Sequence, residues 1–232
     1  AEEETPTEYN NMVSLLMEGE TGTVLQHNGG YEKVAQGTLN KLMTVLLTAE
    51  EIESGGLSIN DVVTVSSNAN AQTGAVVWLM PGEEITIEEL LKSVIIGNAN
   101  DASVALAEIV GGNEEEFTGM MNARAFELGM RNTVFKNPAG YDCAGQYSTP
   151  YDMALLCREL LKHEFLYKIM NTWIDRVRGG QTEIVNENRL VRTYEGVIGL
   201  KASHTEASGY CLALAAERNG KLYLSLIHIS EP

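Results

Sequence analysis

The chain has 232 residues, of which 44% are hydrophobic and 21% charged, and its formal net charge is −16 at pH 7. This length is sufficient for one domain with a full core, or for one domain with an added lobe. The charge opposes binding to nucleic-acid phosphates or to anionic lipid, because both ligands require a basic surface.

The N-terminal segment, residues 1–11, is polar and acidic, which predicts a solvated tail ahead of the folded domain. A start at Ala1 rather than Met allows for a secretion signal removed before it. No stretch of the sequence is both apolar and long enough to span a bilayer. Residues 12–27 alternate in polarity and turn at residues 20–22, which predicts a β-hairpin.

The next segment predicts a buried helix over residues 38–54, because it is mostly apolar and is followed by Gly55 and Gly56. A short strand is predicted at residues 62–65. Residues 68–82 are first polar, then apolar, and end in Pro-Gly, which is typical of a loop with short extended pieces.

The middle of the chain is predicted to be helical, because its apolar residues recur at helical spacing between recognisable start and stop signals. The expected helices are one running through Ile95 after a capping box at Thr86 and Glu89, one over 102–110 capped by Asn100 and Asp101, one over 114–128, and one beginning at Thr149-Pro150.

Beyond Gly180 the pattern returns to strands. They are predicted at residues 197–201, 209–216 and 221–229, the last two joined by the hairpin signal Asn219-Gly220. Strands at both ends and helices between them predict an α+β fold, with one antiparallel sheet built from both chain ends and an inserted helical lobe. We expect the domain to span residues 12–227 and the lobe to span about 58–180.

Three cysteines, Cys143, Cys157 and Cys211, show no metal-like spacing, and the four histidines are far apart. We therefore expect no metal site, no cofactor and no disulfide framework. Cys157 and Cys211 lie in apolar runs and are predicted to be buried, inert thiols.

A first candidate for chemistry is the pair Thr38 and Lys41, at the point where a loop becomes a helix. Residues three apart share a face of a helix, and a helix start favours a developing anion. This is the layout of a nucleophile with a basic partner. The alternative is a threonine N-cap beside a surface lysine.

Two further candidates involve amide and amine side chains. Asn98 and Asn100 lie between two predicted helices, where Asn100 and Asp101 have the alternative interpretation of a helix cap. Lys201 ends the strand predicted at residues 197–201, and Ala202 and Ser203 follow it; the alternative here is an exposed lysine on a sheet edge.

Taken together and in this order, the three stretches resemble the active-site motifs of penicillin-binding proteins and serine β-lactamases, Ser-x-x-Lys, Ser-x-Asn and Lys-Thr-Gly. More narrowly, the chain resembles low-molecular-weight D-alanyl-D-alanine carboxypeptidases over about residues 12–227. The matching positions are Lys41, Met43, Thr44, Asn100, Asp101, Ala102 and Lys201. The departures are Thr38 for the nucleophilic serine, Asn98 for the second serine, Ala202 for threonine and Ser203 for glycine.

The resemblance implies a penicillin-binding-protein/β-lactamase-like fold and a role for each position. Thr38 would attack, Lys41 would act as base, and Asn98 would stand where the family has a proton-relaying hydroxyl. Asn100 would bind the substrate backbone. Lys201, Ala202 and Ser203 would occupy the strand that holds the substrate carboxylate.

The implied function is acyl-enzyme hydrolysis of the terminal D-Ala of peptidoglycan stem peptides, outside the cytoplasmic membrane, with β-lactams as further ligands. We expect it to be impaired, because threonine restricts rotation at Cβ and the other departures remove a relay and a carboxylate contact. The alternative is a pseudoenzyme that binds the peptide or serves as a scaffold. A serine β-lactamase is a weaker reading, because no deacylating glutamate can be assigned.

In relatives the last strand is followed by a helix that packs on the sheet. Here residues 224–232 depart from that pattern. We expect them to be a non-native, truncated C-terminus that leaves an apolar patch of the sheet exposed.

Overall fold

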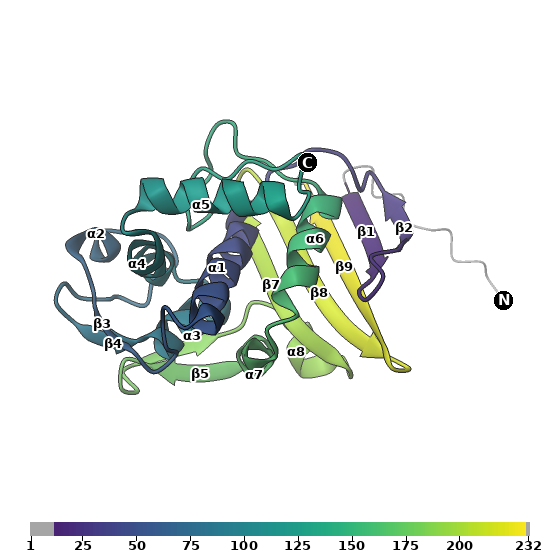
Figure 1. Cartoon of the computed structure of the whole chain (residues 1–232). Coiled ribbons are helices and arrows are strands. Elements are labelled where there is room, and N and C mark those ends of the chain that lie inside the picture. The colour runs from purple at the N-terminus through teal and green to yellow at the C-terminus, as the bar shows by residue number, and fades with distance from the viewer. Residues whose placement is uncertain (1–11, 231–232) are drawn as a thin grey trace.

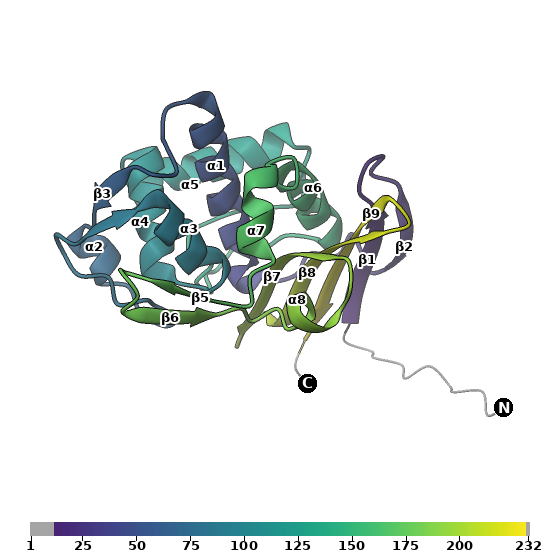
Figure 2. The same cartoon turned by 90° about the horizontal axis from the view of Figure 1, so that it is seen from below.

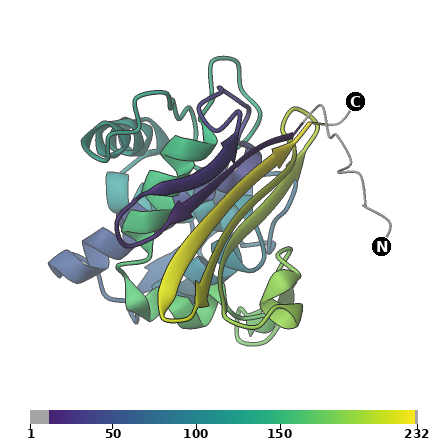
Figure 3. The same ribbon diagram turned by 90° about the vertical axis from the view of Figure 1, so that its right-hand side faces the viewer.

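The structure is a computed structural model that describes residues 12–230. The predicted acidic tail, residues 1–11, lies outside the described residues, as do Glu231 and Pro232. Both ends of the chain contribute to one five-stranded antiparallel sheet, in which early and late strands lie side by side (Figures 1 and 3). In spatial order its strands are β2 (Val24–Asn28), β1 (Met12–Glu18), β9 (Lys221–Ile229), β8 (Gly209–Arg218) and β7 (Val197–Thr205). This confirms the predicted α+β sheet from both ends.

Alternation of apolar residues explains these strands. In β9 every second residue from Leu224 to His228 is buried, as expected for a strand with one face on the core. The turn between β8 and β9 uses Asn219 and Gly220, both with positive φ (53° and 71°), which is the conformation that an Asn-Gly hairpin requires. Strand β1 pairs with β9 along the whole length of β1, from Met12 opposite Ile229 to Glu18 opposite Tyr223.

Helices cover one face of this sheet and continue beyond it as a lobe, as Figures 1 and 2 show. The longer ones are α1 (Lys41–Ser54), α3 (Ile87–Ile95), α4 (Asn100–Gly111), α5 (Glu114–Glu127) and α6 (Pro150–Leu160). They confirm the predicted helices, including the Thr86–Glu89 capping box, the Thr149 cap and the left-handed Gly55 that ends α1.

Several short elements were not predicted. They are η1 (Gly37–Asn40), α2 (Ser67–Asn70), η2 (Glu164–Leu166), α7 (Tyr167–Met170), α8 (Leu190–Thr193), β4 (Glu84–Thr86) and the two-stranded sheet β5–β6 (Ile174–Val177, Thr182–Val185). Strand β3 (Val62–Thr64), which pairs with β4, confirms the short strand predicted at residues 62–65. Helix α2 lies inside the segment predicted as loop. Ser66 caps it by accepting a hydrogen bond from the Ala69 N–H. Elements this short carry too few residues for a periodic pattern.

Helix α1 lies at the centre of the molecule, and its first nine residues, 41–49, are all buried. It packs against α3, α4 and α6, and α6 in turn covers β1, β8 and β9. Cys157 and Cys211 are buried free thiols, as predicted, and burial raises their pKa to about 12 and about 11. Cys143 is an exposed free thiol.

Candidate active site

Thr38 lies in the 3-10 turn η1, which leads directly into α1. Its hydroxyl donates a hydrogen bond to the Ser203 Oγ at 2.8 Å, and its backbone N–H donates to the same oxygen at 2.9 Å. The N-cap interpretation of Thr38 is therefore wrong, because Gln36 and Asn40 hold the N-cap positions of η1 and α1.

Lys41, the first residue of α1, is completely buried, so the surface-lysine alternative is also wrong. Its Nζ donates to the Asn100 Oδ1 at 2.7 Å and to the Ala139 carbonyl at 2.6 Å. Burial and the nearby charge of Lys201 hold the pKa of Lys41 well below its usual range, although Glu187 and Asp101 act in the opposite direction. A neutral amine has two N–H donors and one lone pair, so these two bonds leave its lone pair available for a proton.

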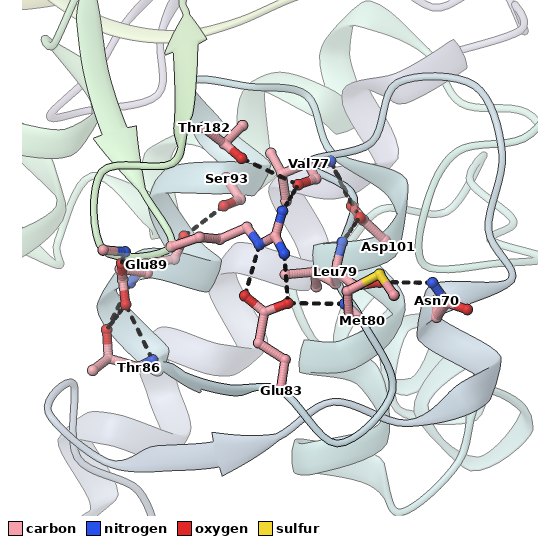
Figure 4. Close-up of polar contacts among 12 residues, drawn as sticks. Asn70, Val77, Leu79, Met80, Glu83, Thr86, Glu89, Ser93, Asp101 and Thr182 are labelled. Carbon is pink, nitrogen blue, oxygen red and sulfur yellow. Dashed lines mark hydrogen bonds and ion pairs between the residues drawn. The ribbon is translucent and has the colours of Figure 1, made fainter.

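Asn100 begins α4, and its amide Nδ2 donates to the Thr73 carbonyl at 2.6 Å. The predicted cap at Asn100-Asp101 is wrong, because Ala99 is the N-cap residue of α4 and no side chain caps this helix. The Asn100 side chain bonds outside the helix, and Asp101 accepts the Ala102 N–H of its own helix as well as partners outside it. The Asp101 carboxylate accepts the backbone N–H groups of Val77 and Leu79, which fixes the neighbouring loop (Figure 4). With its Nδ2 held by Thr73, Asn100 presents its Oδ1 to Lys41.

Asn98 lies in the connection before α4 with φ of 55°, a left-handed conformation that Asn tolerates better than most residues. Its Nδ2 lies 3.2 Å from each carboxylate oxygen of Glu187. An amide in this position donates to a carboxylate but does not readily relay a proton.

Lys201, Ala202 and Ser203 lie on β7, which is the edge strand of the sheet, as predicted. The alternative of an exposed lysine is wrong: Lys201 is 3% exposed, and its Nζ donates to the Val94 carbonyl at 3.4 Å. Burial lowers the pKa of Lys201 to about 8, against the opposing influence of Glu187. Ala202 is half-buried, and Ser203 is buried against Thr38.

The structure thus brings the candidate residues together where the edge of the sheet meets the helical lobe. Ser203 contacts Thr38, Lys41 contacts Asn100, and Lys201 is close enough to Lys41 to influence its pKa. Their catalytic and binding roles remain predictions.

Glu187 is a site residue that the sequence analysis did not identify. Its carboxylate bonds Asn98 and partly offsets the lowering of the pKa of Lys41 and of Lys201, so it is a counter-charge to the two buried amines. It follows β6 between two buried asparagines, Asn186 and Asn188, whose side-chain oxygens accept local backbone N–H groups. That pair of asparagines around one acid is the signal that could have identified it.

Gly37 has a clear steric role beside the site. A Cβ at Gly37 would lie 2.5 Å from the Ser208 Oγ and 2.8 Å from the Ser203 Oγ, closer than real Cβ contacts. Its φ of 51° also favours glycine. The absence of a side chain at residue 37 therefore makes the space that the two serine hydroxyls occupy.

Comparison with known proteins agrees with this geometry. A family model described as D-alanyl-D-alanine carboxypeptidase matches residues 1–229. The D-alanyl-D-alanine carboxypeptidase DacF of Bacillus subtilis is 40% identical over 217 residues, which are 92% of this chain and 56% of the relative. The chain thus spans a little more than half of that protein's length.

Solved structures show the same fold. Penicillin binding protein 6B from Escherichia coli matches with a TM-score of 0.90 and 27% identity, over 99% of this chain and 74% of that one. Penicillin-Binding Protein D2 from Listeria monocytogenes, in its ampicillin-bound form, matches with a TM-score of 0.86 and 24% identity, over 98% and 93% of the two chains.

Proposed function

Because the chain belongs to the D-alanyl-D-alanine carboxypeptidase family, we propose that it acts on the D-Ala-D-Ala end of peptidoglycan stem peptides, with acyl transfer at Thr38 strongly impaired. Such peptides lie in the bacterial cell envelope, so we also propose a location outside the cytoplasmic membrane. Within residues 12–230, no helix combines the length and the apolar character needed to cross a bilayer.

In the proposed reaction the Thr38 Oγ attacks the carbonyl of the penultimate D-Ala, and the Lys41 amine accepts the hydroxyl proton. The protonated Lys41 passes this proton to the amine of the leaving D-Ala, and water then hydrolyses the ester on Thr38. The lowered pKa of Lys41 supports this role, because an amine must be neutral to act as a base near neutral pH.

The observation that carries the impairment is the double hydrogen bond from Thr38 to Ser203. It directs the hydroxyl proton toward Ser203 rather than toward Lys41. It also occupies the Thr38 N–H, a donor placed to stabilise an oxyanion that forms next to Thr38. Asn98 in place of a hydroxyl and Ala202 in place of threonine remove a further relay and a further carboxylate contact.

A β-lactam is the second proposed ligand. The Listeria monocytogenes relative was solved with ampicillin bound, and the β-lactam ring mimics the D-Ala-D-Ala amide. We propose that a β-lactam acylates Thr38 only slowly, because the same hydrogen bonds to Ser203 hold the hydroxyl and the N–H of Thr38.

The alternative function is a pseudoenzyme that binds stem peptides without turnover, and the same double hydrogen bond favours it. Release of D-Ala from diacetyl-L-Lys-D-Ala-D-Ala, measured together with binding of that peptide, separates the two. Slow release that is abolished in Thr38→Ala supports impaired catalysis, whereas binding without release supports the pseudoenzyme. A chain that neither binds the peptide nor releases D-Ala from it would contradict the proposed function.

A further inference from the structure

A cavity of about 830 Å³ adjoins the candidate site. It lies between β7 and the segment around α8, and Trp173, Glu187, Arg189, Arg192, Ser203 and His204 are among its lining residues. Ser203 contacts Thr38 and Glu187 contacts Asn98, so the cavity is continuous with the site through both residues.

The cavity is lined by two arginines and one carboxylate, although the chain as a whole carries a net charge of −16. Within residues 12–230, neither Arg189 nor Arg192 forms an ion pair, whereas Arg124, Arg176 and Arg178 each contact a carboxylate. The Arg192 guanidinium lies 5.8 Å from the centre of the Trp173 ring. Among the described lining residues Glu187 supplies the one carboxylate, and it already bonds Asn98.

The walls of the cavity are held in place by hydrogen bonds. Asn188 accepts the Leu190 N–H and so fixes the start of α8. Trp173 and Val185 lie at one end of the β5–β6 hairpin, whose other end is anchored to the helical lobe. There Arg178 forms a two-pronged ion pair with Glu83, and the Thr182 hydroxyl donates to the Val77 carbonyl (Figure 4).

We propose that this cavity binds a carboxylate of the ligand through Arg189 and Arg192. A guanidinium presents two parallel N–H donors that match a carboxylate, and a preformed cavity lowers the entropic cost of using them. The proposal rests on the proposed function, because it assumes a peptide ligand with its D-Ala-D-Ala end at Thr38. The carboxylate comes either from the terminal D-Ala, which has lost the hydroxyl partner at Ala202, or from a side chain earlier in the peptide.

Three peptides distinguish these sources: diacetyl-L-Lys-D-Ala-D-Ala, its C-terminal amide, and the analogue with a succinyl group on the lysine side chain. Each is titrated into the full chain, with tryptophan fluorescence as the readout because Trp173 lines the cavity. The variants are Arg189→Gln and Arg192→Gln. The control is Arg176→Gln, an exposed arginine of the same hairpin that pairs with Glu183.

We expect either variant to weaken binding of one carboxylate-bearing peptide by about fivefold, and the control to leave it unchanged. A loss for the unmodified peptide that is absent for its amide identifies the terminal carboxylate. If the succinyl peptide binds more tightly than the unmodified peptide, and the variants remove only this difference, the side-chain carboxylate is the group bound. If all three peptides bind and neither variant changes their affinity, the proposal is overturned and the proposed function stays intact. Binding of none of them would overturn both.

Discussion

Replacing Ser203 by glycine should turn the chain into a faster acyl acceptor. The substitution removes the oxygen that accepts both the N–H and the hydroxyl of Thr38. The hydroxyl can then reorient toward the lone pair of Lys41, and the N–H becomes available to a developing oxyanion.

The expected size of the effect follows from those two groups. Loss of a single oxyanion donor typically costs a factor of about 10²–10³ in rate, and a positioned general base contributes about 10²–10⁴. Because Asn98 and Ala202 remain unfavourable, we expect acylation of Ser203→Gly by benzylpenicillin to rise by about 10²-fold. The lost hydrogen bonds and the added glycine should lower the free energy of unfolding by about 2–3 kcal/mol.

The assay is intact-mass spectrometry of the penicillin adduct over time, with the adduct mapped to Thr38 by proteolysis. Ser203→Ala removes the same hydroxyl and should act in the same direction. Ser208→Ala is the matched control, because the Ser208 hydroxyl also lies beside Gly37 but bonds Thr205 and the Gly209 carbonyl instead of Thr38. A folded Ser203→Gly variant that acylates no faster than the parent would refute the reasoning.

Three further predictions concern single positions. Thr38→Ser by itself should give little or no penicillin adduct, because Ser203 still engages the hydroxyl; a rapid stoichiometric adduct on this variant or on the unaltered chain would contradict impairment. Arg178→Ala should lower the free energy of unfolding in urea by about 1.5–3 kcal/mol, because it leaves the largely buried Glu83 carboxylate unpaired; a loss below about 0.5 kcal/mol would show that the pair contributes little. Burial lowers the pKa of Lys201 from 10.5 to about 8, so the unfolded chain binds more protons between these values. Its stability should therefore rise from pH 8 to 10.5, by up to about 3 kcal/mol, and Lys201→Met should lose that part of the slope; equal slopes would contradict the buried, depressed lysine.

The long elements could be predicted because their residues carry a local signal. Alternation and the Asn219-Gly220 turn identify β8 and β9, and the Thr86–Glu89 capping box marks the start of α3. The β5–β6 hairpin gives no such signal. Its anchor is the contact between Arg178 and Glu83, which are 95 residues apart in the sequence. A pairing of that kind depends on the tertiary fold.

The candidate site divides in the same way. Thr38, Lys41, Asn100 and Lys201 could be identified from their resemblance, in order and spacing, to the three family motifs, and the structure brings them together. Glu187 was missed, because its two flanking asparagines are a weak signal among 32 acidic residues and its importance comes from its position near two buried amines. The cap assigned to Asn100 and Asp101 was wrong because Ala99 holds the N-cap position. Asn100 bonds the distant Lys41, and the Asp101 carboxylate holds the loop around Val77.

Two of the departures from the family motifs, Thr38 and Ser203, are in direct contact. Ser203 fits beside Thr38 because residue 37 has no side chain, and Ser208 fills the rest of the same space. An alanine at residue 37 would collide with both hydroxyls, so it would require smaller residues at 203 and 208. Gly37, Thr38, Ser203 and Ser208 therefore share one packed space. This mutual fit is the reason that Thr38→Ser by itself is expected to fail whereas Ser203→Gly, which opens the shared space, is expected to succeed.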